Sequence, residues 1–204
     1  MDDLYRHPSY PLLIVISGPS GVGKDTVIGR MKERGLPFHF VVTATTRAPR
    51  PGEVNGQDYL FYSAKEFAHL LEKGEFLEAA RVYNDYKGIP KQQVRQALAS
   101  GQDVVLRVDV QGAQTVRRLC PDALLIFLFP ASEEDLARRL QERHTESPEG
   151  LSLRLATARE EIGRLGEFDY VVPNRDHRLD ETVDLILGII QAEHARVHPR
   201  QVTL

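Results

Sequence analysis

A glycine-rich stretch near the N-terminus has the residue types and spacing of a phosphate-binding loop. It reads GPSGVGK from Gly18 to Lys24 and lies between the apolar run 12–16 and a helical pattern. Its glycines let the backbone turn sharply and point N–H groups at phosphate oxygens, and the following helix adds its positive N-terminal end. The lysine amine can reach the terminal phosphates of a nucleoside triphosphate. The stretch therefore predicts a binding site for ATP or GTP.

The residue after this lysine departs from the usual pattern. Ser or Thr is usual there, and its hydroxyl binds Mg²⁺, but this chain has Asp25 followed by Thr26. A carboxylate is also an oxygen ligand suited to Mg²⁺, directly or through a water. Alternatively, Asp25 is a favourable anion in the first turn of a helix. The sequence leaves both interpretations open.

A second cluster suited to phosphate binding lies in residues 43–59, which read TATTRAPRPGEVNGQDY. Arg47 and Arg50 stand three apart on a loop stiffened by proline and glycine. Two guanidinium groups held in this way form a bidentate phosphate clamp, to which Tyr59 can add a hydroxyl donor. Two loop arginines are usually only solvated, but beside a triphosphate site they predict the second phosphate site that a kinase needs.

The composition is that of an ordinary globular protein with one domain. Of the 204 residues, 42% are hydrophobic and 27% charged, with a formal net charge of -3. The weak acidic balance argues against nucleic acid as a main partner, and no apolar run approaches the roughly 18 residues that span a membrane. The seven histidines lack metal-ligand spacing. The single Cys120 and a polar N-terminus unlike a signal peptide favour the cytoplasm.

Strand-like apolar runs alternate with helical patterns, which predicts an α/β fold with a mainly parallel sheet flanked by helices. The expected strands are 12–17, 104–108, 124–129 and 170–172. The expected helices are 26–34, 111–119, 133–143, 151–165 and 180–194. Residues 38–90 instead hold short strand-like pieces and one helix, from a capping box at Ser63 to Gly74, and indicate an inserted mixed lobe. Ser132 is expected to cap the 133–143 helix, and the polar last ten residues are expected to be frayed.

The two motifs together, GPSGxGK and TTRxPRPGEVNGxDY, resemble guanylate kinase, a family of nucleoside monophosphate kinases that phosphorylate GMP. The similarity runs from about residue 12 to residue 194. It implies one domain, with a P-loop NTPase-type parallel core, an inserted mixed α/β GMP-binding lobe and a helical lid. The core would span 12–37 and 101–194, the lobe about 38–90 and the lid about 138–155. The implied reaction is ATP + GMP giving ADP + GDP, with Mg²⁺ as the cofactor of ATP and dGMP as an alternative acceptor.

The resemblance also implies roles for residues at the positions of the family's motifs, including Asp25 and Lys87, whose residue types differ from the usual ones. The ATP site would contain Gly18, Pro19, Ser20, Gly21, Val22, Gly23, Lys24, Asp25, Thr26 and Asn174. The GMP site would contain Thr43, Arg47, Arg50, Tyr59, Glu78, Lys87, Gly88 and Asp109. The catalytic charges would be Lys24, Arg47 and the lid arginines Arg139, Arg143 and Arg154. Separately from the resemblance, the side-chain oxygens of Asp25 and Asp109 can reach the metal, directly or through water, as one of the interpretations open for each residue.

Recognition of guanine by these residues makes chemical sense. Guanine presents two donors, N1–H and the 2-amino group, beside the acceptor O6. The Glu78 carboxylate can accept from both donors, Asp109 from one, and the Thr43 hydroxyl can donate to O6. Adenine would leave a buried carboxylate facing a lone pair, which gives strong discrimination. Asp109 also ends an apolar strand-like run, so it can alternatively deliver a carboxylate to the metal and phosphates.

Besides Asp25, several positions depart from the family pattern, among them Pro173, which replaces a typical aliphatic residue. Arg107 stands in an apolar strand where related enzymes often have an acidic residue, which puts a metal-organising role at that position in doubt. Lys87 replaces a frequent Tyr, Ile89 a frequent Ser or Thr, and His144 a usual glycine. Lys87 can still pair with the GMP phosphate as a point charge, whereas Ile89 loses one polar contact.

Three other functions compete with a GMP kinase. A non-catalytic guanylate-kinase-like interaction module would typically have a degraded P-loop and further domains, for which this length leaves no room. A P-loop kinase for another acceptor is disfavoured by the guanine-reading set Thr43, Glu78 and Asp109. A regulatory GTPase would carry an Asn-Lys-x-Asp motif, which this chain lacks. The oligomeric state does not follow from the sequence.

Overall fold

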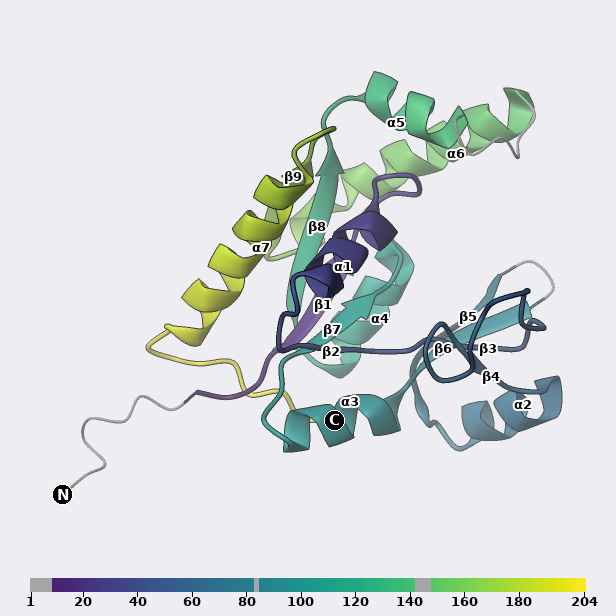
Figure 1. Ribbon diagram of the computed structural model, residues 1–204, viewed down its shortest axis with the longest axis vertical. Helices are drawn as coiled ribbons and strands as arrows, with labels where there is room; N and C mark the ends of the chain where they lie inside the picture. Colours follow the sequence, from purple (N-terminus) through teal and green to yellow (C-terminus); the bar gives the residue numbers. More distant parts are fainter. Residues whose placement is uncertain (1–8, 83–84, 142–147) are drawn as a thin grey trace.

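A five-stranded parallel sheet forms the centre of the molecule (Figure 1). The structure, a computed structural model, describes residues 9–82, 85–141 and 148–204. The sheet order is β2-β7-β1-β8-β9. These strands are β1 Leu13–Ser17, β2 His39–Phe40, β7 Val104–Arg107, β8 Leu124–Pro130 and β9 Tyr170–Asn174. Because neighbouring strands are parallel, their carboxyl ends share one edge, the edge at which open α/β sheets bind ligands.

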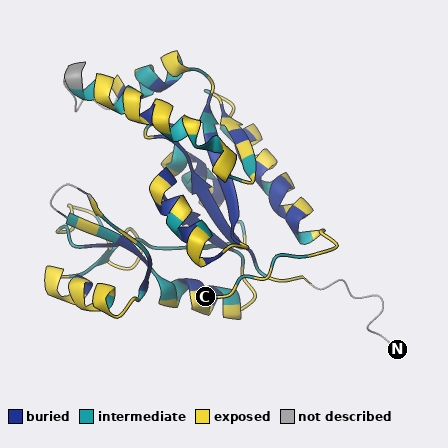
Figure 2. Cartoon of the chain, turned by 180° about the vertical axis from the view of Figure 1, so that it is seen from behind, coloured by how far each residue is buried: buried dark blue, intermediate teal, exposed yellow. Residues whose placement is uncertain are grey.

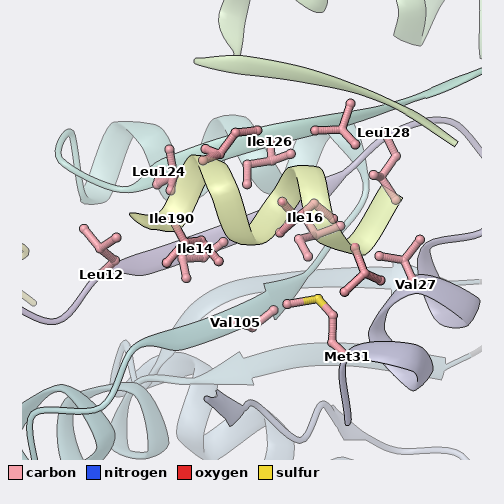
Figure 3. Close-up of a cluster of buried hydrophobic side chains, with 14 of the residues drawn as sticks. Leu12, Ile14, Ile16, Val27, Met31, Val105, Leu124, Ile126, Leu128 and Ile190 are labelled. Atoms are coloured by element: carbon pink, nitrogen blue, oxygen red, sulfur yellow. The ribbon is translucent and has the colours of Figure 1, made fainter. Parts of the chain in front are cut away.

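Helices cover both faces of this sheet, which explains why its central strand is apolar at almost every position. On one face, α1 (Lys24–Glu33) and α7 (Leu179–His194) pack against even-numbered side chains of β1 (Figure 3). On the other face, α3 (Lys91–Ala99) and α4 (Val110–Leu119) pack against the odd-numbered ones. Figure 2 shows the sheet as buried, with exposed outer faces on the helices. This core fixes the position of the loop between β1 and α1.

The inserted lobe has its own four-stranded mixed sheet, in the order β4-β3-β6-β5. Its elements are β3 Ala44–Thr45, β4 Leu60–Phe61, α2 Ala64–Glu72, β5 Phe76–Val82 and β6 Asp85–Pro90. The predicted capping box is confirmed, because Ser63 Oγ accepts from Glu66 N and Glu66 Oε2 accepts from Ser63 N. Gly74 follows α2 with φ +67°, as a helix C-terminus favours. The buried core of the lobe is small and consists of Ala44, Phe67 and Phe76.

Two antiparallel helices, α5 (Glu133–Gln141) and α6 (Pro148–Gly163), form a second projection on the same side of the core as the lobe (Figure 1). A short 3-10 helix, Leu165–Glu167, leads from α6 to β9. Leu136, Leu140 and Ala158 are buried between the two helices. The predicted cap at Ser132 is confirmed, since its Oγ accepts from Asp135 N at 3.1 Å. Arg143, expected in the lid, lies outside the described residues, as does His144.

Several elements differ from the sequence-based expectation. The segment His39–Phe40 pairs with β7 in the central sheet, although the lobe was expected from residue 38. Strand β6 and helix α3 were not predicted, because their short, mixed patterns match neither period clearly.

In the part of the chain that the structure describes, no helix is long and apolar enough to cross a membrane.

The expectation of a frayed C-terminus is wrong. Val202 and Leu204 pack against the hydrophobic cluster on the α3–α4 face. Arg200, with 11% of its side chain exposed, forms an ion pair of 2.7 Å with the buried carboxylate of Glu193. Cys120 Sγ also donates to Thr203 O at 3.7 Å. Polar composition suggested a solvated tail, but the tail packs on the core, and Arg200 and the Thr203 carbonyl have buried partners there.

Candidate active site

The glycine-rich loop lies at the carboxyl edge of the central sheet, between β1 and α1. Gly18 has φ +140°, and a Cβ there would lie 2.4 Å from the Leu128 carbonyl oxygen, so glycine is required. Lys24 Nζ donates to the carbonyls of Gly18, at 2.5 Å, and Pro19, at 3.1 Å. The amine therefore lies over the loop where the terminal phosphates of a nucleotide would bind.

This loop is held from behind by side chains of two other elements. The Val22 carbonyl accepts from Asn174 Nδ2 at 2.7 Å and from Arg139 Nη1 at 2.9 Å. Thr182 Oγ1 in turn donates to Asn174 Oδ1 at 3.2 Å. At Gly23, which has φ +99°, a Cβ would lie 2.6 Å from the Asn174 amide nitrogen. The structure thus places Asn174 as a buried support of the loop. One N–H of its side-chain amide is already bonded to Val22 O.

Arg139 connects the α5–α6 pair to the nucleotide side of the core. Its guanidinium donates to Val22 O and Asn174 O and forms an ion pair with Asp176 at 2.6 Å. Burial opposes ionisation of Asp176, but hydrogen bonds from Arg139 and Arg138 outweigh it and lower its pKa. A hollow beside these groups is lined by Gly21, Gly23, Thr26, Arg139, Asn174, Arg175, Asp176, His177 and Leu179. It adjoins the loop at the place where the rest of the nucleotide would extend.

A second hollow joins the nucleotide side to the lobe. Its lining includes Asp25 of α1, Arg107 of β7, and Thr43 and Tyr59 of the lobe region. Arg107 forms an ion pair with Asp25. Two of the positions that depart from the usual motifs are therefore in direct contact with each other.

The arginine clamp expected in the lobe is partly engaged with a carboxylate. Arg47 forms a two-point ion pair with Glu53, with both nitrogen–oxygen distances at 2.7 Å, and Glu53 also accepts from Arg50 N. The hydrogen bond from Arg47 lowers the pKa of Glu53 to about 2. Two cations lie near the Tyr59 ring, with the Arg47 guanidinium 4.9 Å and Lys87 Nζ 5.6 Å from its centre. Arg47, Tyr59 and Lys87 therefore lie together, while the Arg50 residue is exposed.

The two carboxylates expected to read guanine come from different parts of the molecule and meet near the start of α4. Asp109 is the N-cap of α4 and accepts from Gly112 N at 2.7 Å. A Cβ on Gly112 would lie 3.3 Å from both Glu78 Cγ and Asp109 Oδ1. Burial, with a smaller effect of the neighbouring Asp109 charge, raises the pKa of Glu78 to about 7. These contacts place the partly buried Glu78 carboxylate beside the exposed Asp109 at the boundary of lobe and core.

Packing within the lobe explains why residue 88 is a glycine, which the sequence did not reveal. A Cβ there would lie 2.8 Å from Phe76 Cδ1 and 3.1 Å from Phe67 Cζ, within the stacked aromatic pair of the lobe. Ile89, which follows it, is buried in the core with 3% exposure. Both positions are therefore explained by packing.

Sequence reasoning assigned no role to two acidic residues of this region. Glu53 lies inside the lobe motif, and its spacing of six from Arg47 could have suggested the ion pair. Glu161 of α6 lies close enough to Lys24 and Asp109 for their charges to affect its pKa, which burial raises. It shares a helix face with Arg154, seven residues earlier, and this spacing is the only signal that could have found it.

The described residues contain no group of three or more His, Cys, Asp or Glu that could hold a metal ion alone. Asp25 and Thr26 nevertheless present oxygen atoms in the exposed first turn of α1, beside Lys24. Magnesium commonly keeps several waters and binds through one or two carboxylates plus substrate phosphates. The donor set therefore fits a magnesium ion that arrives with a nucleotide.

The parallel sheet, the phosphate-binding loop, the inserted lobe and the projecting helix pair define a P-loop phosphotransferase of the nucleotide kinase type. The chain belongs to the guanylate kinase family, whose model, described as "Guanylate kinase", matches residues 10–193.

Named relatives and one solved structure agree with this family. "Guanylate kinase 2, chloroplastic/mitochondrial" from Oryza sativa subsp. japonica is 53% identical over 97% of this chain and 70% of its own length. "Guanylate kinase" from Caldanaerobacter subterraneus subsp. tengcongensis is 45% identical over 91% of this chain and 89% of its own. The crystal structure of guanylate kinase from Anaplasma phagocytophilum superposes with a TM-score of 0.72 at 32% identity, covering 93% of this chain and 89% of that one.

Proposed function

We propose that this protein transfers the γ-phosphoryl group of ATP to GMP, giving ADP and GDP. The observation that carries the proposal is the hollow in which residues beside the phosphate-binding loop, Asp25 and Arg107, meet the lobe residues Thr43 and Tyr59. A donor site and an acceptor site that share one hollow are what direct transfer between two nucleotides requires.

On the donor side, the proposal assigns the ATP phosphates to the loop between β1 and α1. Backbone N–H groups and the start of α1 would hold the phosphate oxygens, with Lys24 at the terminal phosphates. The hollow lined by Asn174, Arg175 and Leu179 would take the adenosine part. Adenine contact by Asn174 would then involve atoms beyond the amide N–H bonded to Val22 O.

On the acceptor side, the proposal assigns the GMP phosphate to Arg47, Arg50, Tyr59 and Lys87. Arg47 is already oriented by Glu53 and stacks over Tyr59, so its guanidinium is fixed before a substrate arrives. The base would lie between lobe and core. There Glu78 accepts from N1–H and the 2-amino group, Asp109 accepts from one of them, and Thr43 donates to O6.

The transfer step itself needs no general base, because the attacking GMP phosphate is already an anion at neutral pH. An oxygen of that phosphate would bond to the γ-phosphorus as the bond to the β-phosphate oxygen breaks, so the leaving electrons remain on ADP. Lys24, Arg47 and the lid arginines Arg139, Arg143 and Arg154 would neutralise the shared charge. Magnesium would supply further neutralisation of the ATP phosphates, reached by Asp25 or Asp109, directly or through water.

Water must be kept from the γ-phosphate during transfer, or ATP would be hydrolysed. The lobe and the α5–α6 pair project from the same side of the core, so their approach over the site would exclude it (Figure 1). Small-angle scattering with and without GMP plus an ATP analogue tests this closure. Superimposable profiles would contradict it.

A coupled assay of ADP release tests the function, with ATP, Mg²⁺ and GMP, dGMP, AMP, UMP or CMP supplied in turn. We expect rapid turnover with GMP that collapses in Lys24→Ala and in Arg47→Ala. Turnover with a different acceptor would support phosphoryl transfer as the reaction but would contradict GMP as the substrate. A folded protein that binds GMP but turns over no acceptor would instead be an interaction module.

The proposed reaction belongs to purine nucleotide metabolism. We place the protein in the cytoplasm, because its single cysteine fits a reducing compartment. Immunodetection after cell fractionation tests the location. Enrichment in a membrane or organelle fraction would contradict it.

A further inference from the structure

Arg107 occupies an unusual position for a charged side chain. It is the last residue of β7 and is paired in register with Ile16 of β1, the central strand that leads into the phosphate-binding loop. The other three residues of β7 are at most 2% exposed, whereas 35% of the Arg107 side chain is exposed. Its burial lowers the pKa of the guanidinium. A cation is therefore held, partly dehydrated, at the edge of the sheet where ligands bind.

The partner of this cation lies on the nucleotide-binding helix. Asp25 is the second residue of α1, directly after Lys24, and forms the ion pair with Arg107. The Asp25 side chain is 60% exposed, and ion pairs with exposed carboxylates contribute little to stability. That gain is small beside the cost of partly burying a guanidinium. Stability alone is therefore a weak reason for Arg107 to be there.

The surroundings of the pair point to phosphate binding. Arg107 and Asp25 line the hollow that also contains Thr43 and Tyr59, so the cation lies between the donor side and the acceptor side. A guanidinium has five N–H donors, and one carboxylate engages at most two of them. The remaining donors match the oxygens of a phosphate group.

We propose that Arg107 is an additional catalytic residue, which contacts the phosphates at the point of transfer and is oriented there by Asp25. This inference rests on the proposed GMP kinase function and deepens it. Asp25 then acts as a positioning residue, because its carboxylate holds the guanidinium against α1 beside Lys24. The charge of Arg107 is fixed before substrates bind, so it stabilises negative charge on the phosphoryl group without reorganisation.

The test compares Arg107→Met, Arg107→Lys and Asp25→Asn with the wild-type protein. Met keeps much of the volume and removes the charge, and we expect kcat to fall by about 100-fold. The KM values for ATP and GMP should change by less than about 5-fold, because the contact is made mainly in the transition state. Lys, a point charge on a similar stem, should recover part of kcat. Calorimetry of GMP binding without ATP should give an affinity near the wild-type value.

A double substitution separates a phosphate contact from a purely structural ion pair. If Arg107 serves only to neutralise Asp25, Arg107→Met should cost nothing further in the Asp25→Asn background. If it contacts the phosphates, it should still lower kcat by at least about 10-fold there. The matched control is Arg34→Met at the other end of α1, where Arg34 pairs with Asp184 at 2.6 Å. This control should retain wild-type kinetics.

The outcomes are distinguishable from failure of the proposed function. A wild-type protein without GMP turnover removes the proposed function and this inference with it. An active wild-type protein with a folded Arg107→Met variant whose kcat is within about 3-fold of it overturns this inference alone. Loss of GMP affinity in parallel with kcat would likewise overturn it. If Arg107→Met is unfolded by circular dichroism, the folded Arg107→Lys and Asp25→Asn variants are compared instead. Equal kcat values in these two variants would mean that only the ion pair matters, and would contradict a direct contact between Arg107 and the phosphates.

Discussion

The phosphate-binding loop is supported by side chains from β9 and α5, whereas the acceptor lobe holds its main arginine with a carboxylate from its own loop. Asn174 and Arg139 both donate to Val22 O, so the donor side is tied to distant elements. Arg47 and Glu53 are only six residues apart. The donor side is thus held by elements that are distant in the sequence, and the acceptor side is largely self-contained.

The two regions also differ in the burial that stabilises them. The loop continues into the large cluster between the sheet, α1 and α7, which includes Val22. Val27 belongs to the same cluster (Figure 3). The lobe buries Ala44, Phe67 and Phe76 as its own core. Elements that move during function are drawn from the less stable parts of a protein. The comparison indicates a preorganised donor site and a lobe that can move as a unit.

The largest expected effect comes from removing the donor-side cation. Lys24→Met should lower kcat by about 1000-fold, because its charge stabilises the phosphoryl group in transfer. GMP affinity, measured by calorimetry without ATP, should be unchanged, since the proposed acceptor residues belong to the lobe and to the start of α4. A parallel loss of GMP affinity would show that the two sides are not independent.

On the acceptor side, Glu78→Gln should lower kcat/KM for GMP by about 100-fold, because an amide cannot accept from both guanine donors. KM for ATP should stay near the wild-type value. The wild-type KM for GMP should also rise as the pH falls below about 7, the pKa to which burial raises Glu78, because the protonated acid loses acceptor capacity. This pH dependence should disappear in Glu78→Gln, and its persistence would contradict the assignment.

The same substitution should stabilise the free protein at alkaline pH. The unfolded chain ionises Glu78 near its ordinary pKa of 4.5, whereas the folded state favours the neutral acid up to about 7. The cost to folding is therefore absent below 4.5, grows between these values and is complete above about 7. Denaturant titrations should show Glu78→Gln more stable than wild type by roughly 2 kcal/mol at pH 8 and by little at pH 4.

Asn174→Ala breaks the support of the donor loop and leaves the Lys24 amine in place. It removes the amide that donates to Val22 O and accepts from Thr182 Oγ1. We expect a loss of stability of about 1 to 3 kcal/mol and a rise of about 10-fold in KM for ATP. GMP affinity should not change. Unchanged thermal stability would show that the loop does not depend on this support.

The smallest effect on activity is expected far from both regions. Arg200→Met leaves the buried Glu193 carboxylate without one of its charged donors and should lower stability by about 2 kcal/mol. kcat and both KM values should stay at their wild-type values at temperatures where the variant is folded. The exposed Arg196, which also contacts Glu193, provides a matched control, and Arg196→Met should have a smaller effect on stability.

The features readable from the sequence depend on groups that lie close together along the chain. The glycines of the loop, Lys24 and the Ser63 capping box act within a few residues, so local spacing was enough to predict them. The alternation of apolar strands and helices gave the parallel α/β core for the same reason. The lobe motif, by its resemblance to a known family, indicated the acceptor before any geometry was known.

Tertiary structure decided the contacts between elements, since these depend on sheet order and register. It joined Asp25 to Arg107 across 82 positions, brought Glu78 of the lobe to Asp109 of the core, and turned Asn174 into a support of the loop. It also buried Arg200 against Glu193 in a tail that composition alone marked as solvated. Local sequence fixes the torsion angles and the charges of a segment. Which partner each charge meets is determined only when the parallel strands align their carboxyl ends at one edge.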